Sequence, residues 1–112
     1  MISVIIPVFN TARFLFTCLK SVINQAFQEL EIIVVNDAST DNSLQICNKF
    51  KEKDNRIILI DKKQNEGVEK ARYDGILAAK GDYICFVDLM TGLKQILLKE
   101  CMTKPLKQMQ TM

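Results

Sequence analysis

Residues 31–42 read EIIVVNDASTDN, an apolar run followed at once by a cluster of turn-forming residues. The run at 31–36 has the continuous hydrophobicity of a strand that is buried on both faces, which is typical of parallel sheets. The cluster at 37–42 ends in residues that favour the start of a helix. This stretch therefore predicts a buried strand, a turn and the beginning of a helix.

The same order recurs along the chain. Apolar runs at 2–8, 56–60 and 82–88 predict three further strands. Apolar residues at helical spacing predict helices over 11–25, 44–50 and 68–79, with Asn10 as the expected N-cap of the first. Strands that alternate with helices imply right-handed crossovers and a Rossmann-like, doubly wound parallel α/β sheet.

Composition narrows the class of protein. The chain has 112 residues, is 48% hydrophobic and carries a net charge of +2, which fits one globular domain and favours no nucleic-acid partner. No apolar run reaches the roughly 18–20 residues of a membrane span. Histidine is absent, which excludes His-based catalysis and His metal sites. Cys18, Cys47, Cys85 and Cys101 lie among apolar neighbours, so we expect free thiols and a cytoplasmic location.

Acidic residues at the strand ends are the candidate functional groups. Ligands of such sheets bind at the carboxyl ends of the strands, where Asp37 and Asp88 follow apolar runs. A carboxylate there can accept from a base N–H or a ribose hydroxyl, can hold a divalent cation, or can simply form a turn. The glycines form neither GxGxxG nor a P-loop, which disfavours dinucleotide binding and a Walker ATPase. A signalling receiver domain would need an acidic pair at 8–10, where VFN stands. The lysines at 62–63 and those at 49, 51 and 53 are expected to be solvated on loop and helix faces.

Five segments carry a resemblance to a known family. They are ISVIIPVFN (2–10), CLKSVINQ (18–25), EIIVVNDASTDNS (31–43), NEGVEKAR (65–72) and AKGDYICFVD (79–88). Together they resemble the N-terminal, nucleotide-sugar-binding half of family 2 glycosyltransferases with the GT-A fold, over residues 1–88. The resemblance implies a sheet order of 3-2-1-4. It also implies transfer of a sugar from a UDP- or GDP-linked donor to a saccharide or lipid-linked acceptor, in cell-surface polysaccharide synthesis.

The resemblance also implies roles for particular residues. Pro7 and Phe9 would border the nucleotide base, and Asp37 would read it. Asp88 would open the DxD motif, near the ribose and a Mg²⁺ or Mn²⁺ ion. Arg72 is carried over as a nucleotide-binding residue, although the pair that follows it, YD at 73–74, differs from the usual one. The general base is expected in the acceptor half of the family, so no residue of this chain is predicted to be catalytic.

Residues 89–112 depart from the pattern. The family reads D-x-D-D-W where this chain has DLMTG at 88–92, so Met90 replaces the second metal carboxylate. One base lost after the Asp88 codon would produce this change, because ATG followed by ACT, read in the shifted frame, contains GAC and TGG. We therefore expect the tail to be out-of-frame peptide and the chain to be truncated and inactive. The alternatives are a residual nucleotide-binding module without catalysis, and a native tail whose basic helix at 93–104 lies on a membrane.

Two expectations concern partners and location. The fourth strand would lack a neighbour on one side, so self-association through that sheet edge is predicted. Many members of the family act at the inner face of the membrane, so the resemblance also implies peripheral contact there.

Overall fold

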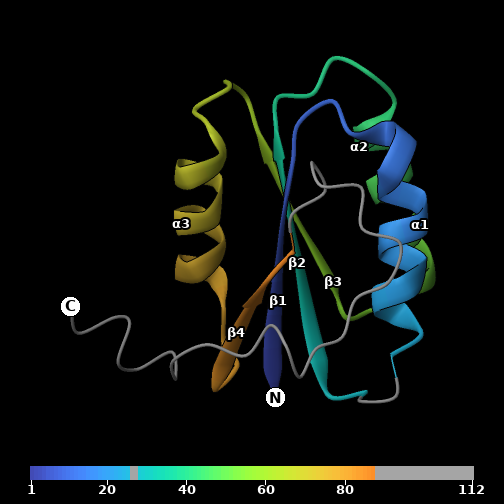
Figure 1. The fold of residues 1–112 in the computed structure, drawn as a ribbon, viewed down its shortest axis with the longest axis vertical. Coiled ribbons are helices and arrows are strands. Elements are labelled where there is room, and N and C mark those ends of the chain that lie inside the picture. The colour runs from blue at the N-terminus through green and yellow to red at the C-terminus, as the bar shows by residue number, and fades with distance from the viewer. Residues whose placement is uncertain (26–27, 88–112) are drawn as a thin grey trace.

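The computed structural model describes residues 1–25 and 28–87, in which strands and helices alternate. The elements are β1 (Ile2–Val8), α1 (Ala12–Ile23), β2 (Leu30–Asp37), α2 (Ser43–Lys53), β3 (Ile57–Lys62), α3 (Val68–Ala78) and β4 (Tyr83–Phe86). The sheet lies between α3 on one face and α1 and α2 on the other (Figure 1). The expectations for Asp88, Cys101 and the tail at 89–112 fall outside the described residues.

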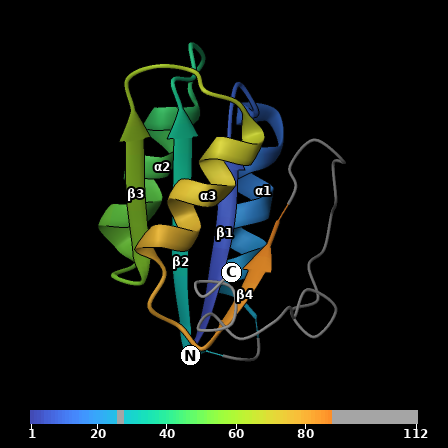
Figure 2. The ribbon, with the colours of Figure 1, turned by 90° about the vertical axis from the view of Figure 1, so that its left-hand side faces the viewer.

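The four strands are parallel and lie in the order β3-β2-β1-β4, which confirms the predicted 3-2-1-4 sheet. All four arrows point the same way in Figure 2. Every residue of β2 is buried, because this strand is central and both of its faces are covered by helices. β4 pairs with β1, and within the described residues no strand pairs with its other edge.

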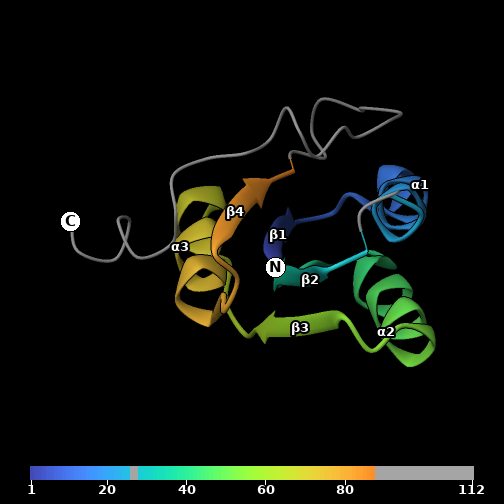
Figure 3. The same ribbon diagram turned by 90° about the horizontal axis from the view of Figure 1, so that it is seen from below.

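Alternate side chains of β1 pack into two separate cores. Val4, Ile6 and Val8 belong to the larger core, which includes the buried apolar residues of α1 and α2. Ile5 belongs to the smaller core, which includes Ala71 of α3. The view from below in Figure 3 shows helices on both sides of the sheet. The doubly wound arrangement expected from the sequence is therefore confirmed.

A buried carboxylate organises the amino ends of the strands. Glu31 is 6% exposed, and its Oε2 accepts hydrogen bonds from Ser3 Oγ at 2.7 Å and from the backbone N–H of Lys80 at 2.8 Å. The Gly81 N–H donates to Ser3 Oγ at 2.9 Å, and a Cβ built on Gly81 would lie 2.6 Å from that oxygen. The loop from α3 to β4 therefore packs too closely on β1 for any larger residue at this position.

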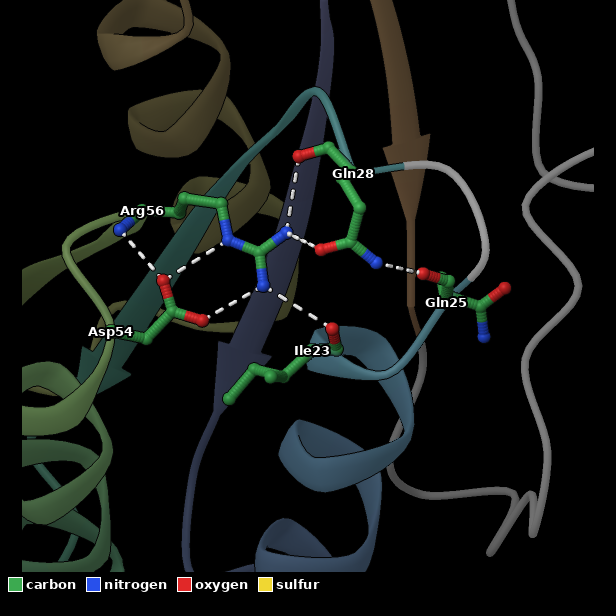
Figure 4. Close-up of polar contacts among 5 residues, drawn as sticks. All are labelled: Ile23, Gln25, Gln28, Asp54 and Arg56. Atoms are coloured by element: carbon green, nitrogen blue, oxygen red, sulfur yellow. Dashed lines mark hydrogen bonds and ion pairs between the residues drawn. The ribbon is translucent and has the colours of Figure 1, made fainter.

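An arginine joins three segments near the same end of the sheet (Figure 4). The Arg56 guanidinium donates to the carbonyl of Ile23, the last residue of α1, and to both the backbone and side-chain oxygens of Gln28. Its remaining contacts are with the Asp54 carboxylate, at 2.8 and 3.0 Å. The hydrogen bonds from Arg56 hold the pKa of Asp54 below its ordinary value. This cluster fixes the end of α1 against the turn that begins β3.

Some boundaries differ from those expected. The third strand was predicted to end at residue 60 but includes Asp61 and Lys62, and Asp37 is the last residue of β2 rather than the first of the turn. The reason is strand pairing, because Asn36 pairs with Asp61, and Asp37 with Lys62, one step beyond the apolar runs. Polar residues that extend a ladder in this way are invisible to a hydrophobic pattern.

The described cysteines are free and buried, as predicted. Burial raises the pKa of both Cys18 and Cys47 to about 12, so these thiols stay protonated and behave as small apolar residues. None of the three described helices has both the length and the apolar character that a membrane crossing requires.

Candidate functional site

A pocket of about 360 Å³ opens at the carboxyl ends of β1 and β2, beside the start of α3. It is lined by Pro7, Val8, Phe9, Thr11, Asp37, Asn65, Gly67, Val68 and Ala71. This is the edge of the sheet where the sequence predicted ligand binding. Three of the five predicted nucleotide-binding residues, Pro7, Phe9 and Asp37, line this one pocket.

Asp37 is the single ionisable residue among those that line the pocket. It is 2% exposed, and its two carboxylate oxygens each accept one backbone N–H at 2.9 Å, Oδ1 from Glu66 and Oδ2 from Gly67. Gly67 has φ = 96°, a conformation that L side chains rarely adopt, and α3 begins directly after it. Asp37 therefore orients the loop before α3, and each of its oxygens keeps a lone pair for another donor.

The walls of the pocket are largely apolar. Phe9 and Val68 are 43% and 49% exposed, although both are large hydrophobic residues. Phe9 directly follows β1, and Val68 is the first residue of α3. An apolar slot with one oriented carboxylate suits a flat heteroaromatic group whose edge carries an N–H.

Asn10 joins the loop after β1 to the loop after β2 and does not cap α1 as expected. Its Oδ1 accepts the backbone N–H groups of Thr40 at 2.7 Å and Asp41 at 3.3 Å, and its own N–H donates to Ser39 Oγ at 3.0 Å. These contacts place Asn10 at φ = 52°, so Thr11 occupies the N-cap position instead. Ala38 in the second loop is also left-handed, with φ = 61°.

Asp41 connects the starts of the two helices that follow these loops. Its Oδ2 accepts the Ala12 N–H at 3.2 Å and its Oδ1 accepts the Ser43 N–H at 2.9 Å. Partial burial acts to raise the pKa of Asp41, but the hydrogen bonds from Ser43 and Ala12 outweigh it and leave the pKa below its ordinary value. The negative charge of Asp41 at the starts of α1 and α2 also interacts favourably with the dipoles of both helices.

Thr11 is a pocket residue that the sequence did not single out. It is 5% exposed, and its hydroxyl has no hydrogen-bond partner among the described residues. Its backbone N–H donates to Ser43 Oγ, while its side chain leaves the helix uncapped. Asn65, Val68 and Ala71 were missed as well, because only the packing of α3 brings them to the ends of β1 and β2.

Arg72 does not line the pocket. Its guanidinium lies over the ring of Phe86, 5.9 Å from the centroid. The Asp74 carboxylate that follows it accepts from Lys62 at 2.5 Å and from Lys70 at 3.1 Å. Hydrogen bonds from these lysines lower the pKa of Asp74, and those from Asp74 and Glu66 raise the pKa of Lys62. The expectation that Lys62 is simply solvated was therefore wrong, because it joins β3 to α3.

The described residues do not form a metal centre. Within 1–25 and 28–87, no three Cys, Asp or Glu side chains are grouped so that they could hold a cation. The predicted metal ligand, Asp88, lies outside the described part of the chain.

Comparison with known proteins agrees with the geometry. The model of the family described as glycosyl transferase family 2 matches residues 3–89. Glycosyltransferase GlyG of Streptococcus pneumoniae is 42% identical over 88 residues, which are 79% of this chain and 29% of that protein. The poly(ribitol-phosphate) beta-glucosyltransferase of Bacillus spizizenii is 44% identical over 90 residues, 78% of this chain and 14% of the relative.

Solved structures share the fold. The crystal structure of an S. aureus TarS fragment in complex with UDP-GlcNAc superimposes with a TM-score of 0.73 at 34% identity. That match covers 79% of this chain and 26% of the TarS fragment. The chain thus spans less than a third of each of these three proteins.

Proposed function

The chain belongs to glycosyl transferase family 2, and from this premise we propose that the pocket holds the nucleotide of a nucleotide-diphosphate sugar. The proposed reaction is transfer of the sugar to a saccharide or lipid-linked acceptor in cell-surface polysaccharide synthesis. TarS, which is 34% identical, was crystallised with UDP-GlcNAc, and a relative acts on poly(ribitol phosphate). We place this activity in the cytoplasm, with peripheral contact to the inner face of the membrane.

One observation carries the proposal, namely a buried, oriented carboxylate among the residues that line a largely apolar pocket. Pro7 and Phe9 both line this pocket, and the base would stack against them. Asp37 accepts one backbone N–H on each oxygen, so a further N–H from the base can be accepted without loss of either bond. Uracil and guanine both carry such an N–H, which is consistent with a UDP- or GDP-linked donor.

The charge of the leaving diphosphate must be neutralised, and the positively charged groups that we propose for this do not line the pocket. Arg72, half-buried on α3, is the proposed phosphate contact from this part of the chain. Mg²⁺ or Mn²⁺, the cation implied by the family, neutralises a departing diphosphate where it is bound. The described residues supply no ligand set that fits it, so its binding rests on Asp88 and we assign it no step.

We expect no sugar transfer from these 112 residues alone. Asp37 is the only carboxylate that lines the pocket within residues 1–25 and 28–87, and it is held by the loop before α3 rather than placed to remove a proton from an acceptor. The alternative, a nucleotide-binding module without catalysis, predicts the same binding and differs only in the role of the whole protein. The family match favours descent from an active transferase over that alternative.

Calorimetric titration of the full chain with UDP and GDP, with and without Mn²⁺, tests the proposal. Phe9→Ala removes one wall of the pocket, and about a tenfold weaker affinity is expected from the lost stacking. Phe16→Ala is the matched control, because Phe16 is a similarly exposed phenylalanine on the opposite face of the sheet. Absence of heat with both nucleotides, or equal weakening by the two variants, would overturn the proposal.

A further inference from the structure

A second cavity, of about 370 Å³, lies between α1 and α2, on the opposite face of the sheet from α3. It is lined by Phe16, Lys20, Ile46, Lys49, Phe50 and Lys53. We call this set of six residues the helix groove. The rings of Phe16 and Phe50 meet edge to face with centroids 5.3 Å apart, and the Lys20 ammonium lies 5.9 Å from the Phe16 centroid. The helix groove is therefore apolar at its centre and cationic at its margins.

The spacing of these residues forms two stripes. Phe16 and Lys20 are four residues apart on α1, and Arg13 precedes them on the same side of the helix. Ile46, Lys49 and Lys53 repeat at three and four residues along α2, with Phe50 between them. The stripe on α1 is separate from the buried side of that helix, which contributes Leu15, Cys18, Leu19 and Val22 to the core. On α2 the lysines are exposed, whereas Ile46 and Phe50 are partly buried and pack against the core beside Cys47.

Charge is segregated between this face and the rest of the described chain. α1 and α2 together carry five basic residues and one acidic residue, a net charge of +4. The other residues of 1–25 and 28–87 carry six basic and ten acidic residues, a net charge of −4. No ion pair within the described residues involves the three groove lysines, whereas Lys62 and Lys70 on the other face are both paired. The helix groove thus presents unneutralised positive charge.

We propose that the helix groove docks the protein on an anionic phospholipid surface. The lysines would contact headgroup phosphates while Phe16, 54% exposed, enters the boundary with the acyl chains. The lysines together with an exposed phenylalanine favour a lipid surface over a soluble polyanion, because a polyanion would contact only the lysines and would leave the phenylalanine without an apolar partner. Long lysine side chains can cover apolar surface and still keep their ammonium groups at the phosphates.

The proposal does not depend on the pocket that Phe9 and Asp37 line. α3 lies across the sheet from α1 and α2 (Figure 3), and no residue lines both the pocket and the helix groove, so contact of the groove with a membrane would not cover the residues of the pocket. Residues 89–112 carry a net charge of +3 and would be repelled by the groove, which argues against that segment as its occupant. A second copy of the chain and a soluble polyanion are the remaining occupants to separate by experiment.

Co-sedimentation of the full chain with vesicles tests the proposal. Vesicles of phosphatidylcholine alone are compared with vesicles that contain about 30 mol% phosphatidylglycerol. Binding is expected only to the vesicles with phosphatidylglycerol, and it should weaken as salt is added. The triple variant Lys20→Gln, Lys49→Gln, Lys53→Gln should reduce the partition coefficient on the order of a hundredfold, about fivefold per lysine. The control makes the same charge change at Lys63, Lys70 and Lys80, outside α1 and α2, and should bind nearly as the parent does.

The aromatic contribution has its own matched pair. Phe16→Ala should weaken vesicle binding several-fold, whereas Leu77→Ala, a more exposed apolar residue on α3, should not. All variants change exposed side chains, and far-UV circular dichroism confirms that each is folded.

Three results would overturn the proposal. Equal loss in the two lysine triples would show attraction by net charge alone, without a defined face. Full competition by soluble polyphosphate, together with unchanged binding of Phe16→Ala, would identify a polyanion site. A dimer in light scattering that the groove variants convert to monomer, without vesicle binding by the parent, would identify a second copy as the occupant.

Discussion

Replacing Asp37 by Asn is the sharpest test of how the pocket is built. The carboxylate accepts the Glu66 N–H on one oxygen and the Gly67 N–H on the other, both at 2.9 Å. An asparagine amide has the same shape but only one acceptor oxygen. One backbone N–H therefore loses its acceptor and faces an NH₂ donor in a position that is 2% exposed.

The expected cost follows from these two contacts. A hydrogen bond to a charged acceptor contributes about 1.5–3 kcal/mol, and a buried donor left unpaired costs a similar amount. Since one of the two bonds survives, we expect Asp37→Asn to lower the free energy of unfolding by about 2–4 kcal/mol. That is a large part of the roughly 5–15 kcal/mol by which small domains are stable.

Two measurements check this expectation. Urea unfolding followed by circular dichroism gives the change in free energy, and amide hydrogen exchange reports directly on the N–H groups of Glu66 and Gly67. Asp61→Asn is the control, because Asp61 lies at the end of the neighbouring strand but is exposed and accepts one side-chain bond, from Asn36. We expect that variant to lose less than about 1 kcal/mol.

This expectation is contradicted if the free energy of unfolding of Asp37→Asn lies within about 0.5 kcal/mol of that of the parent, a change typical of ordinary surface substitutions. It also fails if the Glu66 and Gly67 amides keep their protection in that variant. In either case the loop before α3 would be held by other contacts, and Asp37 would be free to act on a ligand alone.

Four further predictions concern stability and assembly. Ala38→Gly should stabilise the fold by about 0.5–1 kcal/mol in thermal unfolding, because alanine at φ = 61° is strained and the gain exceeds the entropy lost with glycine; equal or lower stability would contradict this. Gly81→Ala should cost about 2 kcal/mol or more, since its Cβ would lie 2.6 Å from a buried hydroxyl, and a neutral result would show that the loop can move away. Arg56→Met should remove part of the acid sensitivity: the folded pKa of Asp54 is below its ordinary value of 3.8, so its contribution is present above that pH and is lost as the pH falls through the folded pKa. The parent should therefore lose more stability between pH 5 and pH 2 than the variant, and parallel pH profiles would count against the pairing. The described chain leaves one edge of β4 unpaired, so light scattering should show concentration-dependent association, and a monomer at all concentrations would argue against it.

Much of the architecture was predictable because it depends on local patterns. Apolar runs separated by helical periodicity specify strands buried on both faces, and a helical crossover between successive strands makes them parallel. The carboxyl ends of such strands meet at one edge, so Pro7, Phe9 and Asp37 could be expected together, and the pocket contains all three. The larger core and the burial of the described cysteines follow from the same patterns.

Other features of the site could not be read from the sequence because they join distant segments. Asn10 looks like a helix cap by residue type, but its contacts with Thr40 and Asp41 place it at positive φ. Arg72 lies in a motif that suggested the pocket, yet its guanidinium stacks on Phe86. In both cases the residue type was consistent with several positions, and packing selected one of them.

The sequence by itself determined the alternation of strands and helices, the buried character of β1 and β2, and the family, because these depend on periodicity and on motifs that are continuous in the chain. Only the tertiary structure decided which groups Asp37 engages, how α3 completes the pocket, and that the basic residues of α1 and α2 gather around two phenylalanine rings. The physical reason is that hydrogen bonds between loops, and charge on a face shared by two helices, depend on distances between residues about 30 positions apart. No local pattern encodes those distances.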